Sequence, residues 1–334
     1  MQSATQTGTP PARSSPWLVV PVFSSSPKLG TALGGLGAFL RTFDPDSRVS
    51  LFGVVYEYTS THSHVAAAFA RASFGADHHR VTIVVSFGHI KNDYDDYLGT
   101  GQPLKTEDDF RGVVGRYLFR LTGDWFIGAQ ASAANYQVLG ATPEDELVLE
   151  TLGVRGLESA ALGAVVMHDS RDNEDMPTKG WFANVNNLAY REGLGGPSSY
   201  DAYRLDFRTF WKHGGRHVLA VRQFNWFSHD APAAAQATVT LRGYKFGQYL
   251  APYMSSLEIE ERVSFSARWG ATLFTGAAGL YGETTLPLGR STYPTFGAGV
   301  HFVLKPKERM ILNLEYAQGV DENRGVYIRL GHAW

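Results

Sequence analysis

Three residue types of a hydrolase triad follow one another in the chain as His168, Asp169 and Ser170. In a triad, the nucleophile, the base and the orienting carboxylate must converge in space on one reacting atom. Contiguous residues on a strand and its turn cannot supply that geometry. We therefore do not expect an enzyme.

Metal-binding residue types also occur without a completed site. The histidine pairs are His62/His64 and His78-His79, and the acidic run is Asp93, Asp95 and Asp96. No carboxylate or cysteine spacing completes a site with the histidines, and the acidic run lacks the Gly and terminal Glu of a calcium loop. We expect no metal and no cofactor.

A different kind of chemistry is indicated by Leu241-Arg242-Gly243-Tyr244, set in a long segment rich in aromatic residues. One interpretation is a solvated Arg in a Gly turn. The other is a loop folded back into a cavity, where an unpaired guanidinium would be costly and a carboxylate is required nearby. The strand-like run that follows places Glu258, Glu260 and Arg262 on one face. We expect Glu260, and Glu258 second, to be the partners of Arg242.

The composition limits the kinds of fold that could hold this loop. The chain has 334 residues, with Lys+Arg 30 against Asp+Glu 32, and this balance gives no case for a nucleic-acid partner. No run approaches the roughly 18 apolar residues of a membrane helix, which excludes helical spans but not a membrane barrel of alternating strands. Cys 0 excludes disulfides and thiolate metal sites. A soluble β-sandwich or propeller is the alternative that composition alone leaves open.

Two-residue alternation favours the barrel. In Tyr203 to Trp211, aromatic residues share one face, and Arg204, Asp206 and Arg208 share the other. Polar faces of Arg, Asp, Gly and Ser are typical of a packed lumen, and aromatic residues near strand ends are typical of bilayer interfaces. Glu261 falls on the expected lipid face and indicates a bulge or a shifted register.

Connections alternate between short and long, as in an outer-membrane barrel. Sixteen strands are counted, from Trp17–Phe23, where Pro21 requires an edge or bulge, to Gly325–Trp334. The sequence thus predicts an all-β, 16-stranded antiparallel transmembrane β-barrel over residues 16–334, with one long loop folded into the lumen. Residues 1–15, rich in Ser, Thr, Gln and Pro, are expected to form a disordered tail without the apolar core of a secretory signal. A signal peptide, if the protein is exported, is not present in this chain.

Four pieces of the sequence resemble the barrel of the outer-membrane-protein-85 superfamily, the BamA/TamA-type bacterial surface antigen family. They are the loop Leu241-Arg242-Gly243-Tyr244; the turn His168 to Asn173 with Pro177 to Gly180; the segments Gly297–Phe302, Lys305–Arg309 and Leu312–Tyr316; and a last strand ending in Trp334. The resemblance implies a luminal loop motif and a periplasmic turn motif of Asp169, Arg171, Asp172, Pro177 and Gly180. The outward Trp334 that ends the last strand resembles a C-terminal assembly signal. Separately, a short first strand with Pro21 and a last strand with Gly331 are expected to meet in a seam held by few ladder bonds.

The chain departs from the family pattern in two ways. Strands begin by Trp17, which leaves no place for periplasmic POTRA domains, so a barrel-only member is expected. Gly276 stands where the family often has an Asp that meets the loop Arg.

The resemblance implies a role in inserting or translocating proteins or lipids at a Gram-negative-type outer membrane. Outer-membrane lipids are the expected surroundings, and client β-barrels or exported proteins are the expected partners. A weak junction between the first and last strands would open sideways and pair with a client strand. The alternative is a passive pore, or a structural or scaffold barrel without such activity.

Overall fold

The computed structural model describes residues 15–26, 30–287 and 290–334. The predicted tail therefore lies, except for Ser15, outside the described residues. In the described part, strands dominate. The first eight are β1 (Trp17–Ser26), β2 (Gly30–Arg41), β3 (Ser50–Thr59), β4 (His64–Phe74), β5 (His79–Tyr94), β6 (Leu104–Thr122), β7 (Trp125–Gly140) and β8 (Gly156–Asp169). The next eight wall strands are β9 (Gly180–Tyr190), β10 (Tyr200–His213), β11 (His217–His229), β14 (Tyr253–Ser264), β15 (Trp269–Tyr281), β16 (Thr292–Lys305), β17 (Met310–Gln318) and β18 (Arg324–Leu330).

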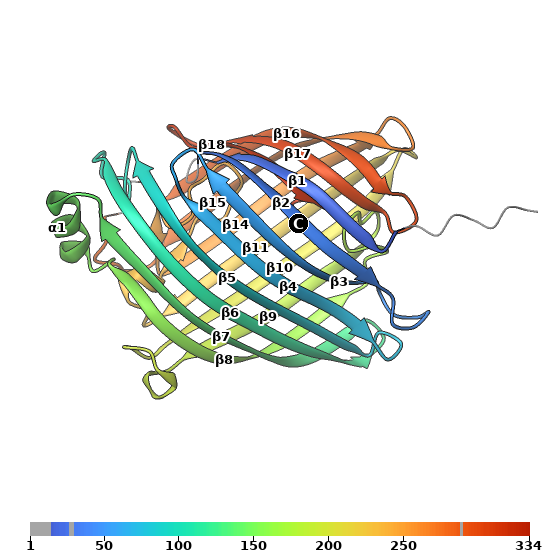
Figure 1. The fold of residues 1–334 in the computed structure, drawn as a ribbon, viewed down its shortest axis with the longest axis horizontal. Coiled ribbons are helices and arrows are strands. Elements are labelled where there is room, and N and C mark those ends of the chain that lie inside the picture. Colours follow the sequence, from blue (N-terminus) through green and yellow to red (C-terminus); the bar gives the residue numbers. More distant parts are fainter. Residues whose placement is uncertain (1–14, 27–29, 288–289) are drawn as a thin grey trace, which may run out of the picture.

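These sixteen strands close into one antiparallel barrel in chain order, with β1 beside β18. Figure 1 shows the closure, where blue β1 and β2 lie next to red β17 and β18. The predicted fold class is confirmed. None of the described helices is long and apolar enough to cross a membrane.

The shorter elements lie in connections at one end of the barrel. They are α1 (Pro143–Leu152), η1 (Glu192–Leu194), η2 (Ala233–Ala235) and the two-stranded ribbon β12 (Ala237–Thr238) and β13 (Leu250–Ala251). Thr142 caps α1 by accepting a hydrogen bond from the Asp145 backbone N–H, and Gly153 ends the helix at φ 66°. α1 lies beyond the wall at this end (Figure 1). We call the end of the barrel that carries α1 the long-loop end, and the opposite end the short-turn end.

The faces of the strands follow the predicted alternation. On β5, Ile83, Val85 and Phe87 are exposed on the outer wall, while the Arg80 side chain pairs with luminal Asp77 and Asp169. Strand β14 pairs with β11 and β15 without a register shift, so the expected bulge at Glu261 is wrong. Glu261 faces outward in a regular ladder.

The junction between first and last strands contains one backbone pair in the described residues, Ser25↔Val326. By contrast, β17 and β18 pair from Leu312↔Leu330 to Gln318↔Arg324. Pro21 lies in β1 opposite Gly35 of β2, and the described residues give it no partner on β18.

Both terminal strands differ from their predicted limits. β1 has ten residues and continues to Ser26, so it is not the short strand expected from Pro21. β18 ends at Leu330, because Gly331 adopts φ 81° and turns the chain out of the ladder.

Candidate functional site

The connection between β11 and β14, residues 230–252, folds into the lumen at the long-loop end. Its apolar side chains are buried against the wall of the later strands. This cluster contains Ala237, Val239, Leu241, Tyr244, Tyr249 and Ala251 from the connection, and Met254, Ala278, Leu280 and Tyr293 from the wall. The predicted luminal position of the loop is thereby observed, and apolar burial holds it there.

Arg242 lies in a clamp of three carboxylates and one ring. Its Nη1 is 2.8 Å from Glu260 Oε2 and 3.0 Å from Glu315 Oε1, and its Nη2 is 3.2 Å from Glu258 Oε2. The guanidinium carbon stands 3.4 Å from the centroid of the Phe274 ring. The structure places both predicted partners here and adds Glu315 of β17 and Phe274 of β15.

Glycines in the neighbouring strands make room for these side chains. A Cβ at Gly276 would lie 2.9 Å from Glu258 Cγ, and a Cβ at Gly299 would lie 2.7 Å from Glu315 Cγ. Glu258 therefore occupies the space that an Asp at position 276 would need.

Gly243 and Tyr244 fix the loop against the last three strands. The Gly243 backbone N–H donates to Tyr327 Oη at 2.8 Å, and Gly243 has φ 97°. The Tyr244 hydroxyl donates to the Pro294 carbonyl at 2.5 Å and accepts from the Val320 N–H at 3.1 Å. The loop is thus bonded to β16, to the β17–β18 connection and to β18.

The far side of the loop reaches the connection after β5. Lys245 is buried and donates to the Asp93 carbonyl at 2.6 Å, and its Nζ is 3.5 Å from Asp95 Oδ2. Gln248 Nε2 donates to the Asp96 carbonyl at 2.9 Å. The loop therefore contacts the acidic run at 93–96. It spans the lumen from the wall of β14 to β18 across to β5.

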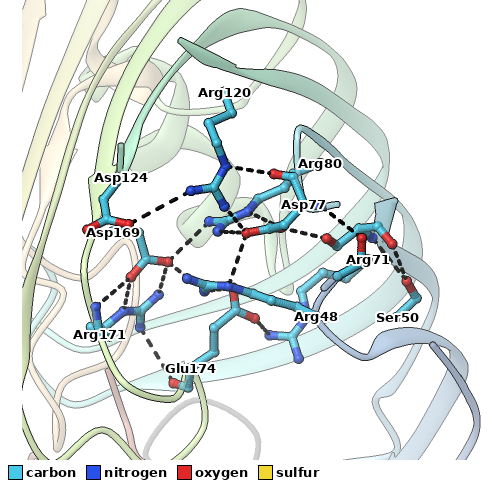
Figure 2. Close-up of polar contacts among 12 residues, drawn as sticks. Arg48, Ser50, Arg71, Asp77, Arg80, Arg120, Asp124, Asp169, Arg171 and Glu174 are labelled. Atoms are coloured by element: carbon cyan, nitrogen blue, oxygen red, sulfur yellow. Dashed lines mark hydrogen bonds and ion pairs between the residues drawn. The ribbon is translucent and has the colours of Figure 1, made fainter. Parts of the chain in front are cut away.

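The connection between β8 and β9, residues 170–179, lies at the short-turn end, where its charged side chains meet arginines from other strands and connections (Figure 2). Asp169 is buried and accepts from three arginines: Arg171 Nε at 2.8 Å, Arg48 Nη1 at 2.7 Å and Arg80 Nη1 at 3.2 Å. Glu174 is 2.6 Å from Arg48 Nη1 and 3.1 Å from Arg71 Nη1. The turn predicted to face the periplasm therefore folds inward.

Local geometry holds this turn in shape. The Asp172 carboxylate accepts from the Thr178 N–H and hydroxyl, each at 2.8 Å. Gly180 has φ 94°, and a Cβ there would lie 2.2 Å from the Ser170 carbonyl oxygen. Asp172 also pairs with Arg309 Nη1 at 2.6 Å, which ties the turn to the β16–β17 connection. The carbonyl of Pro177 lies 3.5 Å from Arg262 Nη1.

Sequence reasoning missed this network because Arg48, Arg71 and Arg80 are far from the turn in the sequence. The number of charged residues in the turn could have indicated such a network. Asp169, Arg171, Asp172, Glu174 and Asp175 are five charged residues within seven positions, more than a solvated reversal of the chain requires.

The C-terminal segment corrects another expectation. Trp334 does not face outward at the end of a strand: it is 5% exposed and lies in the lumen against Phe210, with ring centroids 6.1 Å apart. Its carbonyl oxygen accepts from Arg262 Nη2 at 3.3 Å. Gly331 directs the chain inward, so the terminal aromatic residue packs inside the barrel.

The side chain of His332 in the same segment is 1% exposed, and its Nδ1 is 3.8 Å from Glu260 Oε1. Burial lowers the pKa of His332 well below its ordinary value, and the nearby Arg262 charge lowers it further. The imidazole is therefore neutral near pH 7, and Glu260 is balanced by Arg242 and Arg262 instead.

Solved structures share this architecture over 95% of the chain. BamA from Haemophilus ducreyi lacking POTRA domains 1-3 matches with a TM-score of 0.57 and 11% identity. CdiB from Escherichia coli matches with 0.65 and 13%, and CdiB from Acinetobacter baumannii with 0.61 and 9%. The chain has the barrel fold of BamA and CdiB. It spans 69% of that BamA chain, and 63% and 59% of the two CdiB chains. No family model and no curated protein matches it.

Within this BamA- and CdiB-like barrel, the two inward segments leave separate cavities. A cavity of about 840 Å³ lies beside the long loop and is lined by residues such as Asp108, Arg204, Trp226 and Phe246. A second, of about 400 Å³, lies at the short-turn end and is lined by the arginines of the network and by Trp334.

Proposed function

We propose that this chain is an integral outer-membrane barrel that assists the insertion or translocation of proteins through its β1–β18 seam. The observation that carries the proposal is the single backbone pair, Ser25↔Val326, between the closing strands in the described residues. Each ladder pair contributes to holding neighbouring strands together, and among the described neighbours in the barrel this junction has the fewest pairs to break. Separation would expose two strand edges to which a client strand can add.

The outer wall supports a membrane location. At the short-turn end, Trp125, Trp211 and Trp269 are exposed, and toward the long-loop end Tyr58 and Tyr281 are exposed. Aromatic side chains at two levels with aliphatic ones between them are typical of the two interfaces of a bilayer. Outer-membrane lipids are then the immediate surroundings of the barrel.

Two inward segments favour an assembly or translocation role over a passive pore. The long loop is tied to Glu258, Glu260 and Glu315, and the 170–179 turn is tied to Arg48 and Arg309. A steady open conduit would require one or both of them to leave. Planar-bilayer recording distinguishes the two functions: small flickering currents are expected here, and a steady, ion-selective current would favour the pore.

The test locks the seam with a disulfide. The chain contains Cys 0, so Ser25→Cys with Val326→Cys introduces the sole pair of thiols. The probe is a small, urea-unfolded outer-membrane barrel added to phospholipid vesicles that contain the purified chain. We expect faster folding of the probe with the reduced variant than with empty vesicles, and loss of that acceleration after oxidation.

The matched control shares one substitution. Tyr316→Cys with Val326→Cys joins β17 to β18 at an existing register pair and leaves the seam free. Oxidation of this control should leave the acceleration unchanged. Acceleration that persists in the oxidised seam variant would contradict opening at this junction.

A further inference from the structure

The outer wall carries a carboxylate close to the short-turn end. Glu261 faces away from the lumen between Ile259 and Val263, and its register partners are Leu219 and Leu273. An ionised carboxylate among apolar side chains that face lipid is costly unless it is neutralised. The position therefore requires a cationic partner.

Two histidines meet this carboxylate. His213 ends β10 and His217 begins β11, and they are register partners across a turn in which Gly214 and Gly215 have φ 57° and 77°. Positive φ at both positions is the conformation of a tight hairpin turn, so the glycines bring the imidazoles together. His213 Nε2 is 3.1 Å from Glu261 Oε2, and His217 Nδ1 is 2.8 Å from Glu261 Oε1.

We propose that His213, His217 and Glu261 bind a divalent transition-metal ion, and that zinc is the ion that fits best. Each of the three side chains offers one ligand atom, and these atoms lie within 4.8 Å of one another. Two imidazole nitrogens and one carboxylate oxygen, with a fourth position open to water, form a ligand set that zinc accepts at distances of about 2.0–2.2 Å. Magnesium and calcium prefer oxygen ligands alone and do not suit this set.

The strand ladder makes the site ready for an ion. The three backbone positions belong to β10, β11 and β14, which are hydrogen-bonded neighbours, so binding orders only side chains. These side chains are reachable, with 54%, 42% and 32% of their surface exposed for His213, His217 and Glu261. An ion there would also supply the positive charge that Glu261 requires on this wall.

This grouping could not be predicted from sequence spacing, because Glu261 lies far along the chain from the histidines. The adjacent pairs His62/His64 and His78-His79 attract attention by spacing, yet among the described residues the structure brings a carboxylate and two imidazoles into this arrangement only at Glu261.

The test uses the full chain, without a polyhistidine tag, purified in detergent. Zinc is titrated in competition with a chromogenic chelator, and magnesium is titrated in parallel. We expect one zinc per chain and no competition from magnesium. Cobalt in place of zinc should give the visible absorption of a tetrahedral site.

His213→Ala, His217→Ala and Glu261→Gln should each weaken zinc binding by at least about tenfold, because even the outer contacts of metal sites are worth that much. His229→Ala is the matched control, since His229 is an exposed histidine beside Asp230 at the opposite end of the wall. Its zinc affinity should equal that of the unaltered chain. Heat-modifiable electrophoretic mobility establishes that each variant is folded.

Two outcomes would overturn the proposal. Absence of stoichiometric zinc binding in the folded, unaltered chain would mean that the three side chains are joined only by hydrogen bonds. Unchanged affinity in Glu261→Gln would mean that the carboxylate does not ligate the ion. Neither outcome depends on whether the seam opens.

Discussion

Arg242 and Glu260 form an ion pair of 2.8 Å in which both side chains are excluded from solvent. Arg242 comes from the luminal loop and Glu260 from β14, so the pair joins the loop to the wall. Glu258 and Glu315 are held at the same guanidinium. Arg242 therefore joins three carboxylates of the wall, which also pair with the wall residues Arg222, Arg262 and Arg329.

Arg242→Ala should release the loop and destabilise the barrel. Removing one partner of a buried ion pair leaves uncompensated charge and costs about 3–5 kcal/mol. The measurement is the urea midpoint of unfolding in detergent, together with larger single-channel currents. Arg324→Ala, which removes a solvent-exposed partner of Glu322, is the control and should leave both unchanged. Equal midpoints for the two variants would contradict the clamp.

Gly319→Ala should displace Tyr244 without altering any charge. A Cβ at position 319 would lie 2.5 Å from the Tyr244 ring, so the ring or the strand end must shift. Overpacking of this kind costs about 1–3 kcal/mol. In the control Gly279→Ala, the added Cβ would lie 3.8 Å from the Ser291 carbonyl oxygen, which is an ordinary van der Waals contact. A lower unfolding midpoint for the first variant alone is expected.

Glu174→Gln should remove a pH-dependent contribution to stability. Burial by itself would raise the pKa of Glu174, but Arg71 and Arg48 outweigh it and hold the pKa at about 2, below the ordinary 4.5. Because the folded-state pKa is depressed, the stabilisation is complete above about pH 4.5 and is lost as the pH falls through about 2.

The stability difference between the unaltered chain and Glu174→Gln should thus be on the order of 2 kcal/mol near neutral pH, and should vanish in strong acid. Urea midpoints measured across this range test the sign. Glu322→Gln, at an exposed position, should show no such trend. A difference that grows toward low pH would refute the ionic network as its source.

Trp334→Ala should lower stability, since the ring packs inside the barrel against Phe210 and 5.6 Å from the Arg262 guanidinium. Removing a buried Trp costs about 3–5 kcal/mol. Trp17→Ala, at a position 64% exposed on the outer wall, should have a smaller effect on the unfolding midpoint. If Trp334 acted only as an external assembly signal, insertion yield would fall while the midpoint stayed constant.

The strand face on which a residue lies, and the partners of Arg242 that are near it in the sequence, could be predicted because both depend on short-range periodicity. Glu258 and Glu260 lie on the first strand after the loop, and a period of two is enough to place them on its luminal side. Glu315 could not be assigned in this way. It is 73 residues from Arg242, and its height in the lumen depends on the accumulated stagger of the intervening strands.

The inward direction of the 170–179 turn and of the C-terminal segment could not be predicted from local sequence patterns either. A turn and a chain end obey the same local rules whether they point into water or into a lumen. The 170–179 turn is held inward by the distant Arg48 and Arg71, and Trp334 is held by Arg262 and by packing against Phe210. In each case the contacts are made to residues far away in the sequence.

The 170–179 turn has a mechanical consequence for the seam. On the side of the early strands, the turn forms ion pairs with Arg48 and Arg71. On the side of the late strands, it forms an ion pair with Arg309 and accepts a hydrogen bond from the His332 backbone N–H. These two sides meet at the junction between β1 and β18, so the turn links them from inside the barrel. Widening the junction would therefore also stretch charged contacts that lie inside the cylinder, away from the strand edges themselves.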